Sequence, residues 1–462
     1  MLSLLKSAKF RLFIVPLLLS VILIVTYSSQ IKTIPVSNWD EISWIGSSYF
    51  FDFYIRGDFK NKIWGSLAYD QPNLTKYAYG AWLYPLYLNE KHKNEKSFDF
   101  IRFLMKNGFY EIDKDYKKIY AGYKEISDVV KFNNYDEGTP KYYVAKYGIK
   151  SLKPLTLIYY ARILDILLLT AAVILAYFIA LKYFGIITAI IFSFFYGFNY
   201  LVVHFGLKAQ TESLFLFTFN AAFLFMSLYF FKGRKISYLL LFSLFSGLCM
   251  STKLNGIMFI FIFLICNLLL FFIFKGKKSL DIFHGIVPIL ICLIIFISLN
   301  PFTFPNPIKN IKSMFNYRMH TALKDAGLKP IYFLPDGKSR VKKIFEHFYL
   351  SEKSHYFNDT LLSYKLSQSN NYRISLIILF ILGLFYSIKL AFKKNLAAII
   401  FLCSFFTIIA IMSCYLILDF KRYYIHLVLF FVLYQSLGIY LLLKILLRMF
   451  GSVFQSDKNL LT

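Results

Sequence analysis

Apolar segments of about 20 residues recur along the chain and constrain its fold more than any other feature. Of the 462 residues, 58% are hydrophobic and 20% are aromatic. That is more apolar material than the core of a soluble protein needs, and each segment matches the length of a helix that crosses a bilayer. The sequence therefore predicts an all-α polytopic membrane protein.

The apolar segments give ten candidate membrane spans, which can be checked against the positions of the charges. With the N-terminus in the cytoplasm, every predicted cytoplasmic turn is basic, as the positive-inside rule requires. The C-terminus then also lies in the cytoplasm. The spans are an uncleaved N-terminal anchor at about 12–27, followed by 163–181, 186–203, 213–231, 236–250, 255–274, 283–299, 374–392, 396–417 and 424–446.

This topology predicts how the chain is divided. An anchor (1–28) leads into a large extracytoplasmic loop (29–155), transmembrane helices 2–7 (156–299) and a second extracytoplasmic loop (300–372). Transmembrane helices 8–10 (373–448) and a cytoplasmic tail (449–462) follow.

The first loop carries the features of a membrane–water interface. All four tryptophans lie in or just beyond residues 38–79, and tryptophan favours that interface. We expect residues 75–88 to form an amphipathic helix lying flat on the membrane. We expect residues 89–153 to contain folded helices.

The formal net charge of +27 does not indicate nucleic-acid binding here, because the short loops between spans carry much of it. The remaining excess suits anionic lipid headgroups or phosphates. The five cysteines lie in or at the edge of apolar segments without metal-ligand spacing. They are interpreted as packing residues.

Four basic residues do not follow the topology rule. Lys208, Lys253, Lys421 and Arg422 lie in or beside short turns on the predicted outer side. Charges near hydrocarbon are costly and are usually retained for a partner. We expect all four at the outer mouth that the segment around Asp40 covers.

Several motifs occur together on this predicted outer side. Asp40-Glu41 follows the first span, and Asp70-Gln-Pro-Asn-Leu-Thr-Lys76 lies further along the same loop. Lys208 with Glu212, Gly247 through Thr252-Lys253 to Gly256, and Arg422-Tyr423 follow in that order.

In this order and on one side, the motifs resemble those of the GT-C glycosyltransferases. The most similar branch is the protein O-mannosyltransferase and aminoarabinose-transferase group. The resemblance covers roughly the chain as far as Phe274, plus the span at Arg422. It implies a GT-C-like bundle of about ten helices with an extracytoplasmic active site. It also implies a polyprenyl-phosphate-linked sugar as donor and a hydroxyl acceptor on protein, lipid or glycan.

The resemblance implies a role for each site residue. Asp40 is the candidate general base, and Glu41, the second candidate catalytic carboxylate, supports Asp40 or binds the acceptor. Arg422, Lys253 and Lys76 are the candidate ligands of the donor phosphate. An alternative for Asp40 is that it caps a surface helix running from Ser43 to Ile55.

The match to the family's motifs is incomplete. Pro72, Leu74 and Lys76 fit its His-Pro-Pro-Leu-x-Lys pattern, but Gln71 and Asn73 replace the His and the second Pro. An ordinary loop with a snorkelling lysine is therefore an open alternative. His426 stands where the pattern after Arg422 has Pro. For both Arg422 and Lys253 the alternative role is anchoring to headgroups.

The remaining candidate site residues are Glu212, Lys208, Asp70 and Tyr423. Glu212 stands where the family has an Asp, which in some relatives helps to hold a divalent metal ion. His204 is within plausible reach, although a structural polar cap is its simpler role and no zinc-type spacing is present. Whether the protein uses a metal remains open at this point.

Two further pairs receive structural interpretations. Arg162 and Asp165 are read as a pair three residues apart, facing the interface. Asn300-Pro301 is read as a rigid exit from a span. The segment 309–371 carries no recognisable motif and by position could cover the site or choose the acceptor.

The predicted reaction is sugar transfer with inversion at C1, because one carboxylate activates a hydroxyl opposite the leaving phosphate. The main alternative is a transporter or flippase of a lipid-linked or anionic substrate. Transporters tend to show internal repeats and polar residues at mid-membrane, and neither is evident here. A membrane scaffold that binds a partner is the second alternative.

Overall fold

The computed structural model describes residues 7–31, 34, 40–60, 64, 71–91, 99–107, 153–273, 282–328, 330–349 and 369–449. Within these residues the chain is helical, apart from turns and one isolated antiparallel bridge between Phe333 and Leu418. The prediction of an all-α polytopic membrane protein is confirmed. The expected helices of residues 108–152 and the predicted tail lie outside the described residues.

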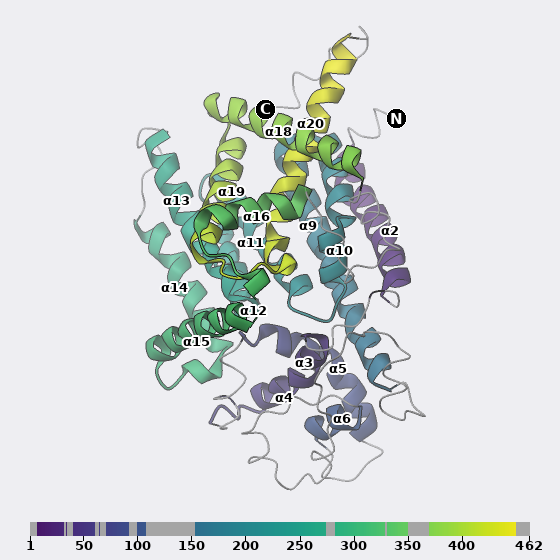
Figure 1. The fold of residues 1–462 in the computed structure, drawn as a ribbon, viewed down its shortest axis with the longest axis vertical. Coiled ribbons are helices and arrows are strands. Elements are labelled where there is room, and N and C mark those ends of the chain that lie inside the picture. The colour runs from purple at the N-terminus through teal and green to yellow at the C-terminus, as the bar shows by residue number, and fades with distance from the viewer. Residues whose placement is uncertain are drawn as a thin grey trace.

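The helices fall into a bundle and two further sets of helices outside it (Figure 1). Those of the first loop are α3 (Asp40–Gly46), a 3₁₀ turn (Ser47–Tyr49), α4 (Phe50–Ile55), α5 (Leu74–Lys91) and α6 (Phe100–Lys106). The bundle contains α2 (Val15–Gln30), preceded by a π-helical turn (Phe10–Ile14), and then α9 (Lys153–Gly197), α10 (Tyr200–Gly206), α11 (Glu212–Phe231), α12 (Ile236–Thr252), α13 (Met258–Ile273), α14 (Ile282–Ser298), α18 (Asn370–Phe392), α19 (Leu396–Tyr415), the 3₁₀ segment η9 (Lys421–Leu427) and α20 (Val428–Met449). Helices α15 (Pro307–Leu328) and α16 (Gly337–Tyr349) come between α14 and α18.

Each predicted span falls on a helix. In the described part of the chain, seven helical stretches are long and apolar enough to cross a membrane, and two shorter apolar helices lie at Ile236–Thr252 and His284–Ser298. The longest stretch, Thr156–Gly197, holds the predicted span 163–181 and most of the predicted span 186–203, whose last residues lie in α10. Gly185 separates them with φ +83°, a backbone conformation that glycine adopts without steric cost.

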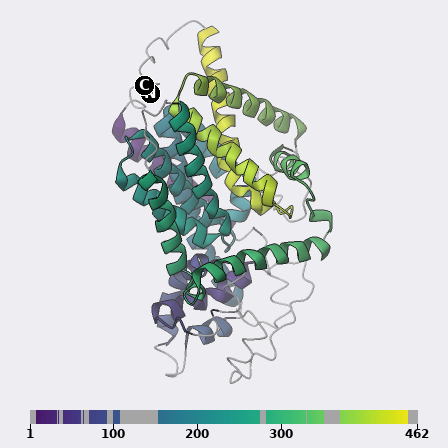
Figure 2. The same ribbon diagram turned by 90° about the vertical axis from the view of Figure 1, so that its left-hand side faces the viewer.

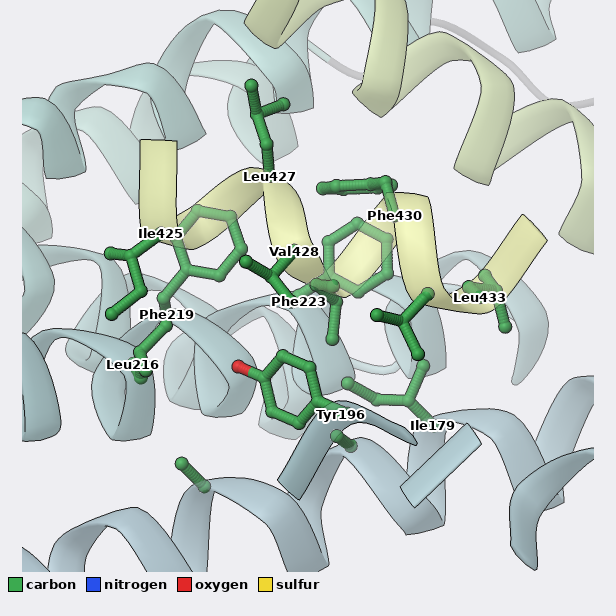
Figure 3. Packing of buried hydrophobic residues seen from close by; sticks show 14 of the residues in the cluster. Ile179, Tyr196, Leu216, Phe219, Phe223, Ile425, Leu427, Val428, Phe430 and Leu433 are labelled. Carbon is green, nitrogen blue, oxygen red and sulfur yellow. The ribbon is translucent and has the colours of Figure 1, made fainter. Parts of the chain in front are cut away.

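The core of the bundle lies where α9, α11 and the η9–α20 segment meet (Figure 3). Tyr196, Phe219, Phe223 and Phe430 pack there with aliphatic side chains and are all fully buried. Small residues bring two other helices together. A Cβ added at Gly383 of α18 would lie 1.7 Å from the Tyr434 carbonyl oxygen of α20. Glycine therefore permits the close backbone contact, as in other membrane helix pairs.

The first-loop helices form a second core that joins one end of the bundle. It combines aromatic residues of α3 to α6 with Met250 at the end of α12, Phe296 at the end of α14 and Met314 of α15. Helix α5 includes the amphipathic helix predicted over residues 75–88. One side of it is buried in this core at Thr75, Tyr79, Leu83 and Tyr87.

Two tryptophans, Trp44 and Trp64, are more buried within the protein than a position at the membrane surface predicts. Trp44 and Trp64 are only 8% and 3% exposed, and the Trp64 ring lies 5.0 Å from the ring of Phe50. Trp82 is half-buried and donates to the Tyr160 carbonyl oxygen at 2.8 Å. Composition alone suggested an interfacial belt, whereas Trp44 and Trp64 hold the first-loop helices together.

Helix α15 runs across the end of the bundle at a steep angle to the long helices (Figure 2). It leads from the end of α14 to α16, which packs against α19, α18 and η9. The region that carried no sequence motif therefore forms two described helices, and the second contacts the segment that carries Arg422.

Candidate functional site

Glu41 forms a fully buried ion pair with Arg162. The Arg162 Nε and Nη2 atoms each lie 2.7 Å from one oxygen of the Glu41 carboxylate. Both side chains are 0% exposed, and the Ala209 amide also donates to Glu41 at 2.8 Å. Arg162 further donates to the carbonyl oxygens of Ile31 and Ile34. The pair thus ties the start of α3 to α9, to the turn after α10 and to the segment after α2.

The interpretation of Arg162 and Asp165 as an interfacial pair is wrong. Both residues are 0% exposed, and Arg162 makes its ion pair with Glu41. Asp165 accepts hydrogen bonds from Ser213 and, at 2.8 Å, from Tyr79. The local spacing suggested a neighbour three residues away, but the partner of Arg162 lies 121 positions earlier in the chain.

Tyr79 of α5 connects the buried carboxylates. Its hydroxyl lies 2.8 Å from Asp165 Oδ1 and 2.9 Å from the carbonyl oxygen of Gln210. Burial raises the pKa of Tyr79 well above its usual value, and the negative charges of Asp165, Glu41 and Glu212 raise it further. Tyr79 therefore remains a neutral hydrogen-bond donor. The charges of Glu41 and Glu212 thus act on Tyr79 together with that of Asp165.

Glu212 and Lys253 form the second ion pair. Lys253 Nζ lies 2.9 Å from Glu212 Oε1, with side-chain exposures of 10% and 1%. Glu212 is the first residue of α11, where the free backbone N–H groups favour negative charge. The Thr211 hydroxyl donates to its other oxygen at 3.1 Å. Lys253 follows the last residue of α12 in an extended conformation.

Tyr423 brings the two predicted phosphate ligands together. The Lys253 ammonium lies 5.5 Å from the centre of the Tyr423 ring, and the Arg422 guanidinium lies 5.7 Å from the same centre. Both distances suit an attraction between a cation and an aromatic ring. Lys253 and Arg422 are 169 positions apart in sequence (422 minus 253), yet both lie at one ring.

A further group of cations lies around His204 at the end of α10. Burial lowers the pKa of His204 well below its usual value, and the positive charges of Lys208, Arg162 and Lys421 lower it further. His204 is therefore neutral. Lys208 is 8% exposed, and its ammonium lies 5.9 Å from the Phe205 ring. The charges of Lys208 and Lys421 thus both act on His204, and their grouping with Lys253 and Arg422 stays a prediction.

Lys76 lies within the first-loop core. It is 4% exposed, its ammonium lies 3.1 Å from Asn73 Oδ1, and the centre of the Phe50 ring is 4.7 Å away. The Asn73 amide in turn donates to the Asn300 side chain at 3.0 Å. Asn300 was read only as part of a turn, and the structure shows that it also anchors the start of α5 to the end of α14.

Two of the predicted site residues, Asp40 and Asp70, lie partly or wholly outside the described part of the chain. Asp40 begins α3, but its side chain is outside the described part of the chain, and so is Asp70 entirely. The predicted contribution of both carboxylates to the site therefore stays a prediction. The helix expected over residues 43–55 is present as the end of α3, a 3₁₀ turn and α4.

The residues around Glu212 do not form a metal-ligand set. Among the described residues, no group of three or more His, Cys, Asp or Glu side chains could hold a metal ion. Glu212 is engaged by Lys253 and Thr211. We therefore derive no step through a metal.

Comparison with known proteins gives two matches. The sequence model of the dolichyl-phosphate-mannose-protein mannosyltransferase family matches residues 157–301. Among solved structures, the fold is similar to that of ArnT from Cupriavidus metallidurans, a GT-C glycosyltransferase crystallised bound to undecaprenyl phosphate. The TM-score is 0.51 at 10% sequence identity, over 94% of this chain and 60% of that chain. The chain thus spans less than two thirds of the ArnT chain.

No match is found among curated proteins. The predicted resemblance to the GT-C glycosyltransferases is nevertheless confirmed at the level of the fold. Lys208, Glu212 and Lys253 all lie in the segment that is similar to the mannosyltransferase family.

Proposed function

We propose that this protein is an integral-membrane glycosyltransferase that moves a sugar from a polyprenyl-phosphate donor to a hydroxyl acceptor. One observation supports this most strongly. Lys253, which pairs with Glu212, lies with Arg422 at the Tyr423 ring, and Tyr79 donates to Asp165 while the charges of Glu41 and Glu212 also act on it. Acidic and cationic groups from distant parts of the chain thus meet at one end of the bundle.

The donor phosphate binds to Lys253 and Arg422. Arginine binds phosphate oxygens with two parallel N–H groups, and lysine acts as a point charge. Lys253 can exchange its hydrogen bond with Glu212 for one with a phosphate oxygen, because a single hydrogen bond joins the two side chains. Lys208 and Lys421 add positive charge nearby. Lys76, held by Asn73, adds a cation from the first loop, and Asp70 is a further site residue of that loop.

Asp40 is the general base. It takes the proton of the acceptor hydroxyl while the hydroxyl oxygen forms a bond to C1 of the sugar. The bond between C1 and the phosphate oxygen breaks, and polyprenyl phosphate leaves with that electron pair. Attack opposite the leaving group inverts C1. Cations at the leaving phosphate stabilise the developing charge, so this step needs no general acid.

Glu41 serves the reaction by holding α3. Because both of its carboxylate oxygens are paired with Arg162, it is poorly placed to accept a proton. Its ion pair fixes the first turn of the helix that begins at Asp40. Of the two alternatives for Glu41, support of Asp40 is therefore the one that the geometry favours.

The reaction takes place at the outer face of the cell membrane. This orientation rests on the basic turns between spans, which place both termini in the cytoplasm. The acceptor is a hydroxyl of a protein, a lipid or a glycan, and the transferred group is a hexose or a pentose. Mass spectrometry of surface glycoconjugates with and without the gene identifies both.

Purified protein incubated with a radiolabelled polyprenyl-phosphate sugar and candidate acceptors tests the proposal. We expect labelled product and an equal amount of free polyprenyl phosphate. In proteoliposomes, movement of intact donor between leaflets without its cleavage would instead support the flippase alternative. If the donor is neither cleaved nor moved, the result favours the scaffold alternative.

A further inference from the structure

A second polar cluster lies behind the cationic segment. Asp419, just before Lys421 and Arg422 in the chain, has a side-chain exposure of 9%. Its Oδ1 atom accepts hydrogen bonds from His347 Nε2 and, at 2.8 Å, from the Tyr424 hydroxyl. Lys343 Nζ lies 3.7 Å from its Oδ2 atom. The cluster thus joins α16 to both sides of Arg422.

His347 connects three elements. It lies on α16, where Glu346 is its neighbour and pairs with Lys343 at 2.9 Å. Its ring centre lies 4.6 Å from that of Tyr424 in η9. Its backbone carbonyl accepts a hydrogen bond of 2.8 Å from Tyr200 of α10. Helix α10 also carries His204, so α16 is braced against both cationic segments of the site.

Backbone contacts hold α16 close to Asp419. The Asp419 amide donates to the Tyr332 carbonyl oxygen at 2.8 Å, and the Leu334 amide donates to that of Ile417 at 2.9 Å. Arg340 donates to the Ser413 carbonyl oxygen at 3.0 Å, at the end of α19. The segment before α16 and the segment before Arg422 therefore form one unit.

The Asp419 carboxylate stays charged in this setting. Burial raises its pKa, but the hydrogen bond and charge of His347, together with Tyr424 and Lys343, bring the pKa below its usual value. A charged carboxylate makes stronger hydrogen bonds than a neutral group. Displacing the segment that begins at Asp419 would break several such bonds together.

We propose that His347 is a positioning residue that, through Asp419, holds Arg422 and Tyr423 against Lys253 for binding of the donor phosphate. The inference rests on the proposed function. It also assigns a role to part of the region between α14 and α18, because α16 then serves the donor side of the site.

Binding of polyprenyl phosphate to the full-length protein in nanodiscs tests this inference. His347→Ala removes the hydrogen bond to Asp419, and we expect about tenfold weaker binding. His347→Gln keeps an N–H donor at a similar distance and should restore binding to within about twofold. Lys342→Ala is the matched control, because this residue of α16 is 75% exposed and contacts Glu346. It should leave binding unchanged.

Hydrogen exchange of residues 416–427 supplies the readout of position. We expect faster exchange in His347→Ala than in the wild type, and near wild-type exchange in His347→Gln. Asp419→Asn provides a second route if His347→Ala does not fold. Wild-type affinity in Asp419→Asn, or equal affinities in His347→Ala and the wild type, would overturn the inference.

The same experiment separates this inference from the proposed function. Polyprenol without phosphate is the reference ligand. If the wild type binds polyprenyl phosphate no better than polyprenol, the donor site fails and the inference fails with it. If the wild type binds and transfers the sugar but His347→Ala does both equally well, only the role of His347 is overturned.

Discussion

The two buried glutamate pairs of the site differ in how firmly they are held. Glu41 and Arg162 share two hydrogen bonds of 2.7 Å and are both 0% exposed. Glu212 and Lys253 share one contact of 2.9 Å, and the Lys253 side chain is 10% exposed. A bidentate arginine pair fixes geometry, whereas a lysine can exchange one anion for another.

The difference suggests different roles for the two pairs: one holds a helix in place, and the other holds a cation for the donor phosphate. The Glu41 pair orders the helix that begins at Asp40, and it has no free oxygen to offer a substrate. In the proposed function, the Glu212 pair holds a cation, Lys253, that binds the donor phosphate together with Arg422 at the same tyrosine ring. Mutations in the two pairs should therefore change different properties of the protein.

The largest expected effect is a loss of turnover when Asp40 is replaced, at the start of the helix that the Glu41–Arg162 pair holds. Asp40→Asn removes the proposed base, and we expect transfer to fall by about 10²–10⁴-fold because general base catalysis contributes that much. Donor binding should stay within about twofold. Initial rates with a labelled donor and direct binding of polyprenyl phosphate measure the two effects. Near-normal turnover would remove Asp40 from the mechanism.

Breaking the Glu41–Arg162 pair should mainly lower the free energy of unfolding. Arg162→Met leaves the Glu41 carboxylate buried without its partner, which costs about 3–5 kcal/mol. Replacing both residues by methionine should recover much of that loss, because no charge is then left buried. Thermal unfolding in detergent measures both variants. A double variant less stable than Arg162→Met would show that the charges are needed for the fold itself.

Removing either of the two cations at the Tyr423 ring should mainly change donor affinity. For Arg422→Met and Lys253→Met we expect donor binding to weaken by about 10–100-fold, because each removes a charged hydrogen bond to phosphate. The acceptor KM should change little. Titrations of each substrate at a fixed level of the other distinguish the two. Equal losses for donor and acceptor would contradict the assignment to the phosphate.

The smallest expected effect is the difference in unfolding free energy between two single variants, Glu212→Gln and Glu41→Gln. Glu212→Gln keeps a hydrogen-bond acceptor for Lys253 and should lower the unfolding free energy by about 1–2 kcal/mol. Glu41→Gln should cost more, because Arg162 stays charged and is fully buried. Unfolding midpoints of the two variants under one condition compare them. A larger loss for Glu212→Gln would reverse our ranking of the two pairs.

The spans were predictable because their signal is local. An apolar stretch long enough to cross a bilayer requires a helix wherever it lies, and each predicted span falls on one. Even the division of the long α9 could be placed near Gly185, between two apolar stretches. The interfacial assignment of Trp44 and Trp64 failed because burial depends on neighbouring helices, which the sequence does not specify.

The site was predictable only in part. The charge anomalies at Lys253 and Arg422 pointed to two residues that lie at one tyrosine ring, and the family motifs added Glu212, the partner of Lys253. The partnership of Glu41 with Arg162 and the cluster at Asp419 were missed. Each joins segments far apart in sequence, and a neighbour three residues away gave a simpler local explanation for Arg162.

An experimental structure with a polyprenyl-phosphate sugar bound tests the central claim most directly. We expect the phosphate to contact Lys253 Nζ and the Arg422 guanidinium, with the Asp40 carboxylate facing C1 of the sugar. The Glu41–Arg162 pair should remain intact, while Lys253 has moved from Glu212 towards the phosphate. A phosphate bound away from Lys253 and Arg422, or Asp40 on the far side of the membrane from them, would contradict the account.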